Sequence, residues 1–81
     1  MEKEEIMERL TPIFAELFDE ENIVLQENMS PENVENWVSI TQLMLIESIE
    51  KEFNIRFKLM EIQQLDNVGN IIATIQKHFD Q

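Results

Sequence analysis

The stretch of sequence that decides the fold runs from Trp37 to Phe53 and reads WVSITQLMLIESIEKEF. Its apolar side chains recur at the spacing of one helix face. The expected buried stripe is Ile40, Leu43, Ile46, Ile49 and Phe53. Ser39 and Gln42 match the serine and glutamine of a capping box, and Asn54 is a typical helix stop. The pattern therefore predicts a helix that begins at Ser39 and ends at Asn54.

The expected position of Ser39 gives its hydroxyl group two interpretations. At a helix N-terminus, backbone N–H groups and the helix dipole stabilise a phosphate, so this hydroxyl is a candidate phosphate acceptor. A serine in a capping box is also fully explained by its structural role. Spacing alone favours the structural interpretation.

Before this segment, the sequence predicts one helix and a long loop. The helix covers residues 3–18, where apolar residues recur at helical spacing, and Thr11-Pro12 predicts a kink or a new start with Thr11 as N-cap. From residue 19 to 38 the helical pattern lapses. A loop of this length in a small domain is usually functional or packed by its own side chains. The side chains expected to pack it are Ile23, Leu25, Val34 and Trp37.

After this segment, the sequence predicts an extended stretch over residues 54–57 and two more helices. Leu59, Ile62 and Leu65 indicate a short third helix. Asp66 or Asn67 is expected to cap a fourth helix, whose apolar stripe is Val68, Ile71, Ile72, Ile75 and Phe79. Gly69, the only glycine, predicts a close approach of another element to this helix. The sum is an all-α fold, a bundle of three main helices and one short helix in a single domain over residues 1–81.

Composition narrows the classes of function. The chain has 17 acidic and 6 basic residues and a formal charge of −11, which argues against nucleic-acid binding because phosphate backbones require Lys and Arg. The acidic surface suits partners with basic patches and favours a monomer. No apolar run has the length of a membrane span, and the N-terminus lacks the pattern of a signal peptide, so we expect a soluble cytoplasmic protein.

The residues for catalysis or metal binding are scarce. With no cysteine, no tyrosine and one histidine, a catalytic triad would need His78 beside a serine, and a role at the end of the last helix explains His78 better. Asp19-Glu20-Glu21-Asn22 lacks the ligand alternation of an EF-hand loop. We therefore expect no enzyme active site and no specific metal site.

A collinear set of segments resembles the acyl carrier protein family. Trp37-Val38-Ser39-Ile40 with the apolar helix after it is similar to the region around the prosthetic-group serine of that family. That similar region extends to Phe53-Asn54-Ile55-Arg56-Phe57. The segment 61–72 resembles the third and fourth helices of the family, and the segment 18–25 resembles the end of its first helix and its long loop. The tryptophan just before the serine resembles a bacterial subgroup that is dedicated to particular pathways.

The resemblance implies a four-helix fold with a 4′-phosphopantetheine arm on Ser39. The thiol of that arm holds acyl or aminoacyl groups as thioesters, which would explain why the chain has no cysteine. The implied function is a non-catalytic carrier in fatty-acid, polyketide or other dedicated biosynthesis. Its implied partners are a phosphopantetheinyl transferase and enzymes that activate or transfer acyl groups.

The sequence departs from the family pattern at three positions. Val38 stands where the family usually has an aspartate that contacts the transferase. Met44 and Lys51 occupy positions of the partner-facing helix that are commonly acidic, while Glu47 remains. Together with Ile40, these are the expected partner-recognition residues. Val38 also keeps a second hypothesis open, in which the chain is a carrier-like interaction module that is never modified.

Overall fold

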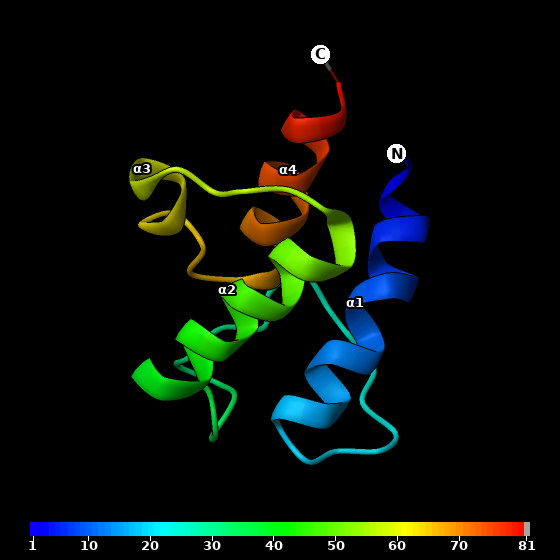
Figure 1. Cartoon of the computed structure of the whole chain (residues 1–81). Coiled ribbons are helices and arrows are strands. Elements are labelled where there is room, and N and C mark those ends of the chain that lie inside the picture. Colours follow the sequence, from blue (N-terminus) through cyan, green and yellow to red (C-terminus); the bar gives the residue numbers. More distant parts are fainter. Residues whose placement is uncertain (81) are drawn as a thin grey trace.

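The computed structural model describes residues 1–80, and within them the chain forms four α-helices and no strand. They are α1 (Lys3–Leu17), α2 (Ser39–Phe53), α3 (Leu59–Ile62) and α4 (Val68–Phe79). Helix α1 packs against α2 and α4, whereas the short helix α3 lies on the opposite side of α4 from α1 (Figure 1). The predicted all-α bundle of three main helices and one short helix is confirmed.

One continuous apolar core joins the three main helices to the loop between α1 and α2. Its buried members are Ile6, Leu10, Phe14, Phe18, Leu25, Trp37, Leu45, Ile46, Ile49, Phe53, Phe57, Leu65, Val68, Ile71, Ile72 and Ile75. Trp37 is the largest of them and lies 5.6 Å from the ring of Phe14 and 5.9 Å from that of Phe18, measured between centroids. Trp37 thus fixes the end of the loop against α1, directly before α2 begins.

The long loop is ordered by its own side chains and by the start of α4. Leu25 and Trp37 are buried, and Ile23 and Val34 pack partly against the core, as the sequence predicted. The carbonyl oxygen of Glu27 accepts the N–H of Gly69 at 3.0 Å. A Cβ atom on Gly69 would lie 3.3 Å from that oxygen, so the close approach predicted at this glycine is confirmed.

The helix ends follow the predicted signals in two places and depart from them in a third. Asn54 ends α2 with the left-handed angles φ 55° and ψ 49°, and the Asn67 side chain accepts the N–H of Asn70 at 2.7 Å and caps α4. The predicted restart at Thr11 is wrong, because α1 continues through Pro12. The Thr11 hydroxyl donates instead to the carbonyl oxygen of Met7 at 2.7 Å.

The face that α2 turns to the core differs from the predicted stripe. Leu45, Ile46, Ile49 and Phe53 are buried. Ile40 and Leu43 were predicted to be buried and are 70% and 68% exposed. The first half of α2 is apolar on several faces, so its periodicity does not identify the inner one. Two smaller differences are that α3 ends at Ile62, before the buried Leu65, and that Phe79 is only partly covered.

Candidate functional site

Ser39 is exposed and is the first residue of α2. The residue before it, Val38, is the N-cap, with the extended angles φ −122° and ψ −176°. The capping box predicted for Ser39 and Gln42 is therefore wrong, because the cap lies one residue earlier. Ser39 has no capping role, so the structural explanation of its hydroxyl group no longer applies.

The cap of α2 is built without a side-chain acceptor from its N-cap residue. An aliphatic Val38 accepts no hydrogen bond, and no side chain caps the N–H groups of the first turn. The side chain of Thr41 instead holds the backbone that leads into α2. Its hydroxyl oxygen accepts the N–H of Val38 at 2.8 Å and lies 2.7 Å from the carbonyl oxygen of Asn36. The first-turn N–H groups beside Ser39 thus remain open to an external acceptor.

Gln42 connects two segments that flank Ser39. Its Oε1 accepts the indole N–H of Trp37 at 2.5 Å, and its Nε2 donates to the carbonyl oxygen of Leu65 at 3.0 Å. Sequence reasoning gave this side chain to the helix cap and missed the bridge. The signal that could have indicated it is the indole of Trp37, because a buried indole N–H requires an acceptor.

A groove of about 400 Å³ opens beside Ser39, between the start of α2 and the connection from α3 to α4. Its lining residues are Pro31, Trp37, Val38, Ser39, Gln42, Ile62, Gln63, Leu65 and Asp66. Five of these nine residues are apolar, so the groove can accept an apolar group.

The surface that the first half of α2 exposes beside Ser39 is apolar, and the nearest charge across the groove is Asp66. Val38, Ile40 and Met44 are 57%, 70% and 48% exposed, and Leu43 lies among them along α2. No residue from 37 to 46 is charged, although the chain carries a net charge of −11. The sequence-predicted residues Val38, Ile40 and Met44 therefore lie on one accessible helix with Ser39.

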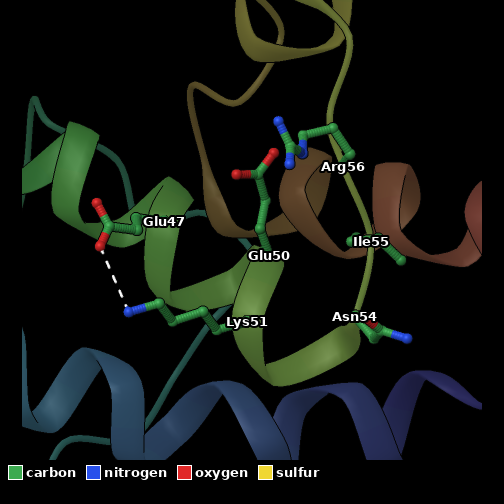
Figure 2. Close-up of a pocket in the computed structure, with 6 residues that line it drawn as sticks. All are labelled: Glu47, Glu50, Lys51, Asn54, Ile55 and Arg56. Carbon is green, nitrogen blue, oxygen red and sulfur yellow. Dashed lines mark ion pairs between the residues drawn. The ribbon is translucent and has the colours of Figure 1, made fainter.

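The last two predicted recognition residues lie further along α2. Glu47 and Lys51 form an exposed ion pair at 3.6 Å, drawn as the dashed line in Figure 2. Exposed pairs of this kind contribute little to stability. Their effect is to cancel one acidic charge on the face of α2 that continues from Ser39.

Figure 2 also shows a second hollow, of about 570 Å³, at the end of α2. Glu50 and Arg56 point toward one another across it. The Glu50 carboxylate accepts the backbone N–H of Phe57 at 2.8 Å and so holds the extended segment after α2. This hollow lies at the end of α2, whereas Ser39 lies at its start. The hydrogen bond from Phe57 gives Glu50 a role in holding the backbone after the helix.

The far wall of the Ser39 groove is anchored by Glu61 of α3. Its carboxylate accepts the N–H of Lys58 at 2.8 Å and lies 3.1 Å from Nε2 of His78 in α4. The hydrogen bond from Lys58, aided by His78, holds the pKa of Glu61 below its ordinary value of 4.5, against the effect of partial burial. The contact with Glu61 thus ties His78 of α4 to α3.

The Glu61 anchor predicts a pH-dependent stability. A carboxylate with a lowered folded-state pKa stabilises the fold above about pH 4.5, and this contribution disappears as the pH falls through the lowered pKa. We expect Glu61→Gln to reduce the free energy of unfolding by about 0.5–1 kcal/mol at neutral pH. The difference from the wild type should shrink below about pH 4. Urea titrations at several pH values measure this.

The same substitution at an exposed loop position is the control for this prediction. Glu32→Gln should change the free energy of unfolding little at any pH. A Glu61→Gln variant that stays equally destabilised at low pH would show that the carboxylate charge is not the cause.

Residues 1–80 contain neither of two other kinds of feature. No group of three or more acidic or histidine side chains in this range is placed to hold a metal ion. In the same part of the chain, no helix has the length and apolar character needed to cross a membrane.

Comparison with known proteins identifies the family. No protein-family model matches the chain, and no curated protein sequence matches it. Among solved structures, it is similar to the holo acyl carrier protein from Geobacter metallireducens, with 37% sequence identity and a TM-score of 0.82. The match covers 90% of this chain and 84% of that one. With this identity over nearly the whole chain and the same helical fold, the protein belongs to the acyl carrier protein family.

Proposed function

We propose that this protein carries acyl or aminoacyl groups as thioesters on a 4′-phosphopantetheine arm attached to Ser39. The observation that carries the proposal is the exposed Ser39 hydroxyl at the start of α2, in a chain whose structural relative is a holo acyl carrier protein. When bound, the arm supplies the thiol that forms the thioester. Because the chain has no cysteine, this sulfur would be its only thiol.

The residues around Ser39 fit a phosphodiester. Since Val38 offers no acceptor, the first-turn N–H groups of α2 are available to phosphate oxygens. The positive end of the helix dipole favours the negative charge there. A phosphate on Ser39 would then supply the acceptor that the N-cap residue does not.

The apolar surface around Ser39 supports a particular kind of partner recognition. We propose that Val38, Ile40 and Met44 contact the transferase and the acyl-transferring enzymes through packing, with Glu47 and Lys51 at the edge of the contact. Apolar side chains that are half to two-thirds exposed on one helix are a typical protein-contact surface. A monomeric carrier of this kind would act in fatty-acid, polyketide or another dedicated biosynthesis.

The proposal is tested by incubating the protein with coenzyme A and a broad-specificity phosphopantetheinyl transferase. In this reaction, the Ser39 oxygen bonds to phosphorus and loses its proton, and the diphosphate bond of coenzyme A breaks and releases adenosine 3′,5′-bisphosphate. We expect intact-protein mass to increase by one phosphopantetheinyl group, and peptide mapping to place it on Ser39.

The two other serines of the chain provide matched controls. Ser30→Ala and Ser48→Ala should be modified like the wild type, whereas Ser39→Ala should gain no mass. If a known carrier is modified in the same tube while the wild-type protein is not, the proposed attachment at Ser39 is rejected.

Val38 favours a second candidate function, a carrier-like module that binds a partner and is never modified. An acidic residue at this position is the usual transferase contact in the family pattern, and here it is replaced by an exposed valine. This alternative predicts that Ser39→Ala supports full function in the native host. Loss of function by a Ser39→Ala protein that folds normally would exclude it.

A further inference from the structure

The two hydrogen bonds of the Gln42 side chain, to Trp37 and Leu65, form a bridge that bears on which acyl groups the protein can hold. We propose that Gln42 is a specificity-determining residue, which limits the Ser39 groove to short acyl groups by closing its inner end. This inference rests on the proposed function, because it concerns the group that the arm would carry. It assigns a role to a side chain that neither the cap of α2 nor the attachment of the arm requires.

The first observation is where the two ends of the Gln42 amide are fixed. Oε1 accepts the N–H of Trp37, on the loop before α2, and Nε2 donates to the carbonyl of Leu65, on the connection between α3 and α4. All three residues line the groove. The amide therefore spans the groove from one wall to the other.

The second observation is what lies behind the amide. Trp37 is 2% exposed and packs edge-on against Phe14 of the central core. Leu65 is also 2% exposed. Both side chains present only their outer edges to the groove. An acyl chain that passed between them toward Phe14 and the central core would have to displace the Gln42 amide that joins them.

Displacing the amide is unfavourable for two reasons. It would leave the indole N–H of Trp37 and the carbonyl group of Leu65 without partners in buried positions, and a buried polar group without a partner is strongly destabilising. It would also separate Trp37 from aromatic neighbours that pack closely in the core. A short acyl group fits in the groove outside the amide and meets neither penalty.

The test uses acyl forms of the full chain, prepared with the transferase from butyryl- and decanoyl-coenzyme A and checked by intact mass. In the wild type, we expect the decanoyl form to melt no higher than the butyryl form. In Gln42→Ala, the longer chain gains access to the interior, so the decanoyl form should melt about 4 °C or more above the butyryl form.

The emission of Trp37, the only tryptophan, gives a second measurement. In the wild type, the butyryl and decanoyl forms should emit at the same wavelength, because the Gln42 bridge stops a longer chain from passing the outer edge of the indole. In Gln42→Ala, the decanoyl form should emit at a shorter wavelength than the butyryl form. A purely structural role for Gln42 would not make the emission depend on acyl length.

Gln64→Ala is the matched control, because Gln64 is exposed and does not line the groove. It should behave like the wild type in both measurements. If Gln42→Ala does not fold, Gln42→Thr takes its place in both measurements.

The outcomes separate this inference from the proposed function. If the wild type gains no acyl-phosphopantetheinyl mass, the proposed function fails and the inference fails with it. If the wild type is loaded and its decanoyl form melts above its butyryl form by as much as in Gln42→Ala, the inference alone is overturned. Equal melting of the two wild-type forms, with a difference only in the Gln42 variant, supports it.

Discussion

Replacing Trp37 with alanine is expected to remove about 3–5 kcal/mol of the free energy of unfolding. The side chain is almost completely buried between Phe14, Phe18 and the start of α2. A domain of 81 residues has a total stability of roughly 4–12 kcal/mol. The substitution should therefore remove a quarter or more of the stability, which urea titration followed by circular dichroism would measure as a much lower midpoint.

The expected loss of stability has two sources, the buried aromatic volume of Trp37 and the hydrogen bond of its indole N–H, and two variants separate them. Trp37→Phe keeps most of the aromatic volume and removes the N–H that Gln42 accepts, so it should cost about 1–3 kcal/mol. Phe79→Ala removes an aromatic ring that is 39% exposed and should cost less than Trp37→Ala. If Trp37→Ala is no more destabilising than Phe79→Ala, Trp37 does not hold the loop to the core.

The elements that the sequence predicted well are those in which local chemistry and packing agree. Asn54 ends α2 in the left-handed region that asparagine tolerates, and Asn67 caps α4 through its own side chain. Gly69 permits an approach of the Glu27 carbonyl that leaves little room for a larger side chain. Each of these signals depends on one or two residues and is readable from their identity.

The start of α2 could not be predicted in the same way. Serine at position 39 is a strong N-cap signal, yet the helix is capped one residue earlier, at a valine that has no capping group. Tertiary contacts decide this register: Trp37 is buried, and Gln42 is held by Trp37 and Leu65. Since Leu65 is far along the chain from Gln42, no local pattern contains that information.

The sequence pattern wrongly predicted Ile40 and Leu43 as buried for a related reason. Ile40 and Leu43 continue the periodicity of Ile46 and Ile49, and Leu45 offers a second apolar register. The core of a small bundle can cover only one of these registers. The other stays exposed, and it is the face that carries Ser39, which explains why the proposed partner surface is apolar in so acidic a chain.

We expect Val38→Asp to change both the stability of the protein and its modification. Aspartate at the N-cap accepts first-turn N–H groups and interacts with the helix dipole, so the free energy of unfolding should rise by about 1 kcal/mol. In the family pattern, an acid at this position contacts the transferase. A charge-assisted hydrogen bond is worth about 1.5–3 kcal/mol, so kcat/KM for modification by a broad-specificity transferase should increase roughly tenfold to hundredfold.

Two further variants separate the effect of Val38→Asp on the helix cap from its effect on recognition by the transferase. Val38→Asn caps the helix about as well as aspartate and adds no charge, so it should match the stability of Val38→Asp with a much smaller gain in kcat/KM. Val24→Asp adds the same charge at an exposed loop valine and should leave kcat/KM nearly unchanged. If Val38→Asp is modified no faster than the wild type although it is more stable, Val38 does not limit recognition by that transferase. The apolar residues Ile40, Leu43 and Met44 would then carry the contact, because they are the large hydrophobic side chains that α2 exposes.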